Sequence, residues 1–272
     1  MQQAKAYLQR HPVSSYFCMT YTISWLGALL VVLPTVIQGR AITQINGLLM
    51  FPVLLLGPSV TGIVLTGMLD GREGLRELFS RIGHWRVNVR WYAAILIPPV
   101  LVLAVLFSLH ALLSSSFSPH LNPKGILYGI VPGFLEEIGW MGFAFPRMQR
   151  GRSVLSAGLL LGLLWGIWHL PVIDFLGAAY PHGMFWLSFA LSFIVAMMAI
   201  RLLIVWVYSH TQSILLAQLI HISSTGSLVV FSPLFITPAQ EALWYGIYAG
   251  TLWLAVALII VCDSKHLVYE SP

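Results

Sequence analysis

The sequence predicts an all-α protein, a polytopic bundle of about eight transmembrane helices. Of its 272 residues, 58% are hydrophobic and only 8% are charged, whereas soluble globular domains carry about 25% charged residues. The apolar residues also gather in runs of about 20, the length that an α-helix needs to cross a bilayer. So little charge cannot cover a water-facing surface, and we expect one integral membrane domain over residues 1–272.

Polar or helix-breaking segments separate the eight apolar runs. The runs cover residues 15–37, 47–69, 91–114, 125–146, 153–172, 183–207, 211–232 and 240–262. The clearest separators are residues 38–46, 70–90, 114–124, 147–152 and 233–240. The first run follows Lys5 and Arg10 and is too long for the core of a signal peptide, so we expect it to be retained as a span.

Most lysines and arginines fall on one side of these eight spans. If the N-terminus is cytoplasmic, twelve of the 14 lie on the cytoplasmic side, and only Arg40 and Lys124 lie outside. The cytoplasmic set is Lys5, Arg10, Arg72, Arg76, Arg81, Arg86, Arg90, Arg147, Arg150, Arg152, Arg201 and Lys265. By the positive-inside rule this split favours an even number of spans with both termini in the cytoplasm. We predict a multi-pass protein of the cell (inner) membrane.

The segment 70–90 has the pattern of an amphipathic helix lying on the membrane surface. Leu75, Leu78, Phe79 and Ile82 share one helical face, and arginines lie around it. Such a helix rests on lipid headgroups. A solvated connecting loop is the alternative.

Other features exclude several classes of protein. The net charge of +5 does not indicate nucleic-acid binding, because the basic residues sort by loop and form no stripe among exposed aromatics. Cys18 and Cys262 lie in apolar runs, where we expect small buried hydrophobic side chains. They provide neither a disulfide framework nor a cysteine-based metal motif.

Two adjacent glutamates, Glu136 and Glu137, lie in the middle of the fourth run, in PGFLEEIGWMGFAFPR. A charged side chain at the centre of a span costs about 2.5–3.5 kcal/mol on insertion scales. Some gain must offset this cost, or one carboxyl must be protonated. Neighbouring residues on a helix point about 100° apart, so we expect one carboxyl to face the reacting centre and the other a partner helix. A pair that only joins helices is the alternative.

Two further spans each carry a histidine. His169 lies late in the fifth run, in LLWGIWHLP, one turn after Trp165. His221 lies in the middle of the seventh run, and Thr225 follows one turn later on the same face. Each histidine alone is compatible with a structural role. Together with the glutamates they predict a site in which carboxylate and imidazole groups activate water or stabilise an oxyanion.

Glu136, His169 and His221 also match the ligand set of a hydrolytic zinc site, which makes Zn²⁺ a candidate cofactor. The sequence contains no HExxH motif. Metal-dependent and metal-free hydrolysis therefore both stay open. A transporter that uses Glu136 and Glu137 as proton or cation sites is a further alternative.

In this order, the motifs resemble those of the CAAX-protease and bacteriocin-processing (CPBP) family, which includes the type II CAAX prenyl endopeptidases. The family's first motif is a Glu-Glu pair followed by three residues and an arginine. Glu136 and Glu137 match the pair, and Met141 stands where the arginine belongs. The second motif, an aromatic residue followed after three residues by histidine, matches as Trp165 and His169.

The third motif of the family is a histidine followed after three residues by asparagine or a similar polar residue, here His221 and Thr225. The resemblance implies an intramembrane endopeptidase with eight helices that cleaves a peptide bond of a lipidated or membrane-inserted protein or peptide. It assigns Glu136 and His169 to the activation of water. It assigns His221 and Thr225 to the oxyanion, with Glu137 as a supporting group.

The resemblance covers residues 50–230 and has two departures. Met141 leaves Glu137 without the fixed cationic partner that the motif supplies, and Thr225 donates one hydrogen bond where an amide donates two. Both departures favour the alternative of a non-catalytic protein of the same fold, such as a bacteriocin immunity or scaffolding protein. The expected partners are a peptide or protein substrate and the lipid bilayer, with no nucleic acid. The oligomeric state is not predicted.

Overall fold

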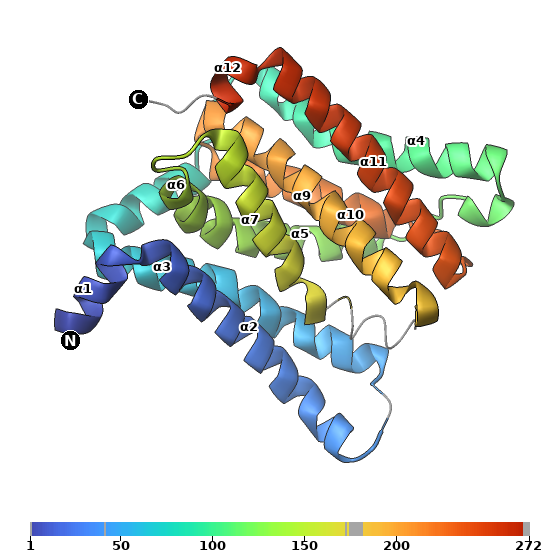
Figure 1. Cartoon of the computed structure of the whole chain (residues 1–272), viewed down its shortest axis with the longest axis horizontal. Coiled ribbons are helices and arrows are strands. Elements are labelled where there is room, and N and C mark those ends of the chain that lie inside the picture. Colours follow the sequence, from blue (N-terminus) through green and yellow to red (C-terminus); the bar gives the residue numbers. More distant parts are fainter. Residues whose placement is uncertain (1, 41, 172, 174–181, 269–272) are drawn as a thin grey trace.

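The computed structural model describes residues 2–40, 42–171, 173 and 182–268. Within these ranges the regular elements are helices and no strand is present. Figure 1 shows the long helices packed side by side in one bundle. The predicted all-α membrane bundle is confirmed. Asp174 and Glu270, which we expected in a loop and a tail, lie outside the described residues, as does the end of the predicted span 153–172.

Helices occur at all eight predicted runs. They are α2 (Pro12–Ile37), α3 (Gln44–Ile82), η1 (Val89–Leu96) with α4 (Ile97–Leu112), α5 (Lys124–Gly139), α7 (Val154–Trp168), α9 (Trp186–Thr211), α10 (Ile214–Val230) and α11 (Pro238–Cys262). Shorter elements are α1 (Gln2–Arg10), η2 (Ser115–Phe117), η3 (Trp140–Ala144), α6 (Phe145–Met148), η4 (Gly183–Phe185) and α12 (Ser264–Leu267). Several helices begin at a side-chain cap; Ser213, for example, accepts a hydrogen bond from the backbone N–H of Leu216 (3.1 Å).

Five helical segments in the described residues are long and apolar enough to cross a membrane. They are Pro12–Ile37, Ile45–Ile82, Val89–Leu112, Gly183–Thr211 and Pro238–Cys262. α7 and α10 are apolar but shorter. α5 passes into η3, a single π-helical turn, and then into α6, so the fourth run is not one uninterrupted α-helix. The count of eight spans and the cytoplasmic position of both termini therefore stay predictions.

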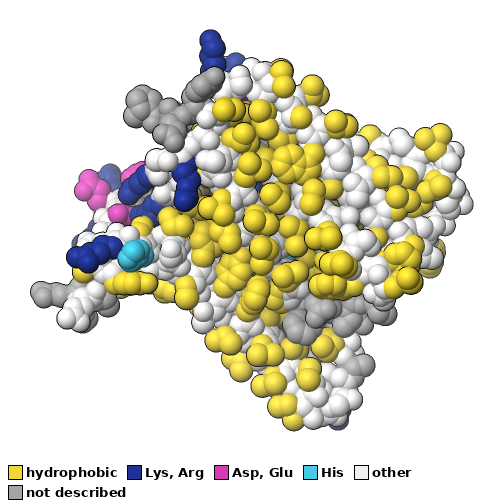
Figure 2. Space-filling view, viewed as in Figure 1, with side chains coloured by type: hydrophobic (Ala, Val, Ile, Leu, Met, Phe, Trp, Pro, Cys, Tyr) yellow, Lys and Arg dark blue, Asp and Glu magenta, His cyan; other side chains and the backbone are white. Residues whose placement is uncertain are grey.

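Large apolar side chains lie exposed on the outside of the bundle. Leu254 is 68% exposed, Leu258 67% and Leu30 67%. Figure 2 shows hydrophobic side chains spread over the bundle, while charged side chains gather at the end where Figure 1 places α1 and α6. A surface of this kind is suited to lipid rather than to water.

Cys18 and Cys262 belong to this outer surface. Both are exposed, so the prediction of buried cysteines was wrong. In a membrane helix the side that faces lipid is as apolar as the side that faces protein, and the local sequence does not distinguish them.

The helix α3 bends at Gly71, where φ is 68°, in the left-handed region that glycine adopts without a steric penalty. Beyond the bend lies the predicted amphipathic segment. Leu78 is fully buried against the bundle, but Phe79 is 51% exposed. Arg81 donates a hydrogen bond to the hydroxyl of Tyr208 on α9 (2.7 Å). The segment is therefore a helix as far as Ile82, attached to the bundle by one side.

Glycines allow α5 to lie directly against its neighbours. A β-carbon on Gly129 would lie 2.6 Å from the carbonyl oxygen of Ile222 on α10, and one on Gly133 would lie 2.7 Å from the backbone nitrogen of the same residue. On its other side, Gly139 faces the backbone of Pro58 on α3, 2.1 Å from such a β-carbon. Small residues of this kind let backbones approach closely in membrane bundles. α5 is thereby held between α3 and α10.

Candidate active site

The glutamate pair lies near the end of α5, in the interior of the bundle. Glu136 is 1% exposed and Glu137 is 0% exposed. Because consecutive helical residues point about 100° apart, the two side chains leave α5 in different directions. Each carboxyl group therefore has its own set of partners.

Glu136 accepts hydrogen bonds from two tryptophans. Its Oε2 accepts from Nε1 of Trp140, one turn later in the chain (3.1 Å), and from Nε1 of Trp165 on α7 (2.8 Å). Both donors converge on the same oxygen. In the part of the chain that the structure describes, Oε1 accepts no hydrogen bond, so this oxygen can address a water molecule or a substrate.

Glu137 binds one cationic and one imidazole partner. Its Oε2 lies 2.7 Å from Nη1 of Arg201 on α9, and its Oε1 lies 2.7 Å from Nδ1 of His221 on α10. Arg201 and Glu137 have fully buried side chains, and that of His221 is 1% exposed. A buried carboxylate needs such partners because its desolvation is otherwise uncompensated. Glu137 therefore fixes the orientation of the His221 ring.

His169 follows directly after the last residue of α7. Its Nδ1 lies 2.7 Å from the carbonyl oxygen of Trp165, one turn earlier. A carbonyl can only accept, so Nδ1 carries the proton and donates it. In the neutral ring this leaves Nε2 with a free lone pair, the form that a base or a metal ligand requires. The side chain is half-buried, so it reaches the edge of the packed interior.

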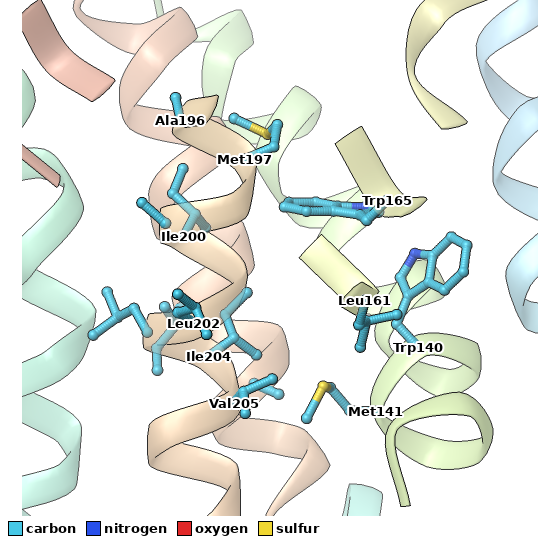
Figure 3. Packing of buried hydrophobic residues seen from close by; sticks show 14 of the residues in the cluster. Trp140, Met141, Leu161, Trp165, Ala196, Met197, Ile200, Leu202, Ile204 and Val205 are labelled. Carbon is cyan, nitrogen blue, oxygen red and sulfur yellow. The ribbon is translucent and has the colours of Figure 1, made fainter. Parts of the chain in front are cut away.

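Trp165 lies at the centre of the site. Its ring centroid is 5.0 Å from that of His169 and 5.1 Å from that of His221, both edge-to-face. The guanidinium of Arg201 lies 4.1 Å from the same ring. Figure 3 shows the indole lying between Ile200 of α9 and Trp140. Both glutamates and both histidines of the predicted site are thus bound to this indole directly or lie one partner away from it.

Thr225 is less closely connected to the site. It is half-buried, one turn after His221 on α10, and its hydroxyl makes no hydrogen bond to another described residue. On the preceding turn, Nε2 of Gln218 donates to the carbonyl oxygen of Phe134 on α5 (2.8 Å). This bond joins α10 to the backbone of α5 two residues before Glu136.

The predicted zinc ligands do not form a metal site in this arrangement. Among the described residues, no three His, Cys, Asp or Glu side chains lie close enough together to hold a metal ion. Oε2 of Glu136 is taken by two indoles, whereas Oε1 of Glu136 and Nε2 of both histidines accept or donate no hydrogen bond among the described residues. Free donor atoms are therefore present, but in the described part of the chain they are not gathered as closely as a zinc site requires.

Arg201, which we counted with the cytoplasmic residues, is 0% exposed inside α9 and points into the bundle. Its side of the membrane stays a prediction. An arginine isolated within a long apolar run is the signal that could have identified it as a site residue. Removing it from the twelve cytoplasmic residues and from the 14 in total leaves eleven of 13, so the charge asymmetry still favours the same orientation.

The expectation that Glu137 lacks a fixed cationic partner was wrong, because the cation comes from α9. Met141 itself is fully buried, and Figure 3 shows its side chain directed toward Val205. The two tryptophans that bind Glu136 were not predicted as site residues either. Trp140 stands four residues after Glu136 on the same helical face, a spacing that could have revealed the contact.

Comparisons with known proteins agree with the motifs. Residues 118–227 match the family model for type II CAAX prenyl endopeptidases, Rce1-like. Over 266 residues the chain is 27% identical to CAAX prenyl protease 2 of Methanococcus maripaludis, and the alignment covers 92% of each chain. The matched region contains all five predicted site residues and Arg201. The resemblance predicted from the three motifs is confirmed.

Proposed function

Because the chain carries an Rce1-like type II CAAX prenyl endopeptidase domain over residues 118–227, we propose that it hydrolyses a peptide bond of a membrane-associated or lipidated protein. The observation that carries this proposal is that Glu136, His169 and His221 all contact Trp165, while Glu137 holds His221. Ionisable groups at this depth are costly, and a functional role is the first explanation for them. The name of the archaeal relative makes a prenylated C-terminal peptide the first substrate to test.

Glu136 is the proposed base. Its Oε1 takes a proton from water, and the water oxygen forms a bond to the carbonyl carbon of the peptide. The two indole N–H groups hold Oε2 and keep the carboxylate in place. His169 presents Nε2 as an acceptor that orients the same water. When the C–N bond breaks, the proton passes from Glu136 to the leaving amine.

His221 is the proposed oxyanion donor. Glu137 holds its Nδ1, so Nε2 is the atom that can face the substrate. With a proton on Nε2, the ring donates to the oxygen of the tetrahedral intermediate, and the Glu137 carboxylate stabilises the resulting imidazolium. The hydroxyl of Thr225, one turn further along α10, is the proposed second donor.

We propose that these side chains act without a metal ion. The support is the spacing of the site residues, since no three His, Cys, Asp or Glu side chains among the described residues lie close enough together to hold one metal ion. We also propose that the protein lies in the cell (inner) membrane with both termini in the cytoplasm. The support is the distribution of its basic residues.

The departures from the family motifs no longer favour a non-catalytic immunity or scaffolding protein. Arg201 supplies the cation that Met141 lacks, and Thr225 retains one hydrogen-bond donor. No observation favours a transporter. The endopeptidase is therefore the function that the site supports best.

A reconstituted cleavage assay tests this function. The purified protein in liposomes is expected to cleave a prenylated C-terminal peptide, and Glu136→Gln is expected to abolish cleavage while insertion and folding persist. Glu73→Gln, an exposed change outside the site, is the matched control and should retain activity. Retained cleavage by Glu136→Gln would refute the assignment. Loss of wild-type activity on chelation, restored by added zinc, would refute the metal-free route.

A further inference from the structure

Arg201 has few polar partners for a buried cation. Its Nη1 contacts Glu137 at 2.7 Å, while Nε and Nη2 are buried and have no hydrogen-bond partner among the described residues. Its guanidinium lies 4.1 Å from the ring centroid of Trp165, whose negative face attracts a cation. Both neighbours belong to the candidate active site. Arg201 therefore interacts with that site and with little else that is polar.

Met141 stands four residues after Glu137, at the position that the family motif gives to arginine, and it lies in the π-helical turn η3. Met141 is directed toward Val205, which is itself one turn from Arg201 on α9. Position 141 therefore lies near the part of α9 that carries Arg201.

We propose that Arg201 is a positioning residue that supplies, from α9, the positive charge that holds Glu137 for its contact with His221. This inference rests on the proposed function and deepens it. Glu137 has two oxygens, one for Arg201 and one for Nδ1 of His221. Without the cation, Glu137 is an unpaired buried charge, which must turn away or take up a proton. In both cases the His221 ring loses its fixed orientation.

A set of four variants tests the proposal in the full-length protein. Arg201→Met is expected to lower kcat by up to about 10²–10³-fold, the cost of losing one oxyanion donor, with little change in KM. Met141→Arg alone is expected to lower kcat as well, because it adds a second buried cation near Arg201. The combined variant M141R/R201M moves the charge from α9 to η3 and is expected to be more active than either single variant. Arg201→Lys retains the charge and should retain part of the activity.

A second measurement reports on the contact itself and does not need activity. The Nδ1–H proton of His221, bound to a buried carboxylate, should give a downfield resonance in ¹⁵N-histidine-labelled protein, assigned by its absence in His221→Gln. The resonance should disappear in Arg201→Met and return in M141R/R201M. If the wild-type protein cleaves no peptide, the proposed function fails, and this resonance still decides the role of Arg201.

Several outcomes would overturn the proposal. Wild-type kcat and an unchanged His221 resonance in folded Arg201→Met would show that the cation does not position the site. Arg201→Met could fail to fold, which gel filtration in detergent would reveal. In that case the kcat of Met141→Arg is compared with that of M141R/R201M to test the role of Arg201. The proposal requires that M141R/R201M has a higher kcat than Met141→Arg. A lower kcat in the combined variant contradicts the proposal.

Discussion

Four different parts of Trp165 each make a contact with another residue of the site. Its indole N–H binds Glu136, its carbonyl oxygen binds His169, its ring face lies against Arg201, and its ring edge contacts His221. A phenylalanine would keep the ring contacts and lose the N–H. At the scale of single residues, a change from Trp165 to phenylalanine therefore removes the hydrogen bond to Glu136, the proposed base, and leaves the packing of the ring in place.

Trp165→Phe tests that hydrogen bond. It is expected to lower kcat by about 10- to 100-fold, less than the full contribution of a general base, which is about 10²–10⁴-fold. The matched control is Trp140→Phe, which removes the other, longer bond to the same oxygen (3.1 Å against 2.8 Å) and should have the smaller effect. Steady-state kinetics of both variants, with thermal unfolding to confirm folding, measure the difference. Unchanged kcat in Trp165→Phe would contradict the role of Glu136 as a base held by two indoles.

The sequence analysis identified the glutamates and histidines because ionisable side chains within apolar runs are unusual and can be seen one run at a time. The ion pair of Glu137 and Arg201 could not be predicted in this way, since its members are 64 residues apart on different helices. An arginine near the end of a run is also compatible with a side chain that reaches the membrane surface. Only the packing of α9 against α7 and α10, which brings Arg201 to Glu137, distinguishes the two cases.

At the scale of helices, the close contact between α5 and α10 determines whether Glu137 can reach His221. Gly129→Ala places a β-carbon 2.6 Å from a carbonyl oxygen and 2.8 Å from Cα of Gly226, and backbone atoms cannot move aside cheaply. We expect a loss of about 1–3 kcal/mol in the free energy of unfolding, together with a loss of activity.

The matched control is Gly250→Ala on α11, where a β-carbon meets nothing within 4 Å. This change should be neutral, or stabilising by about 0.5–1 kcal/mol, because alanine favours a helix. Denaturant unfolding in detergent measures both variants. Equal stability of the two would show that the α5–α10 contact tolerates an added methyl group.

The apolar runs located the long helices, because a run of about 20 apolar residues leaves few alternatives in a membrane. Their interruptions were harder to predict. The bend at Gly71 requires a positive φ, which many glycines in this chain do not adopt. The π-helical turn η3 follows the glutamates directly, and such turns are frequent at functional sites, but the residues Trp140–Ala144 carry no separate signal for it.

At the scale of the whole molecule, two titratable groups near the C-terminus couple stability to pH. Asp263 accepts hydrogen bonds from His210 (2.5 Å) and Trp206 (2.9 Å). Burial raises the pKa of Asp263, but these hydrogen bonds outweigh it and hold the pKa below its ordinary value. His266 stacks on His210 at 3.9 Å, and burial together with that neighbour lowers the pKa of His266 below its ordinary 6.5.

Both pKa shifts make the folded protein less stable as the pH falls. A lowered pKa in the folded state means that the unfolded chain binds the proton first, so stability falls as the pH drops below the ordinary value. For His266 this loss begins near pH 6.5, and for Asp263 it begins near 3.8. His266→Gln should therefore flatten the decline of Tm as the pH falls below 6.5. An identical decline in the variant and the wild type would contradict the prediction.

The orientation of the whole bundle is testable with single cysteines in a protein that lacks Cys18 and Cys262. We expect Ser118→Cys, in the segment after α4, to react with a membrane-impermeant thiol reagent in intact cells with a permeable outer layer. We expect Gln149→Cys, after α6, to react only once the membrane is opened. The reverse pattern would show that the distribution of basic residues does not determine the orientation.

The pairing of Glu137 with Arg201 also has a consequence for the order in which the protein is made. The ribosome reaches Arg201 only 64 residues after Glu137, and translation at about 5–20 residues per second makes that a delay of several seconds. During this time α5 holds an acidic side chain whose counter-ion has not yet been synthesised. Until Arg201 is made, Glu137 of the nascent α5 must therefore either carry a proton or lie in a polar surrounding such as the insertion channel.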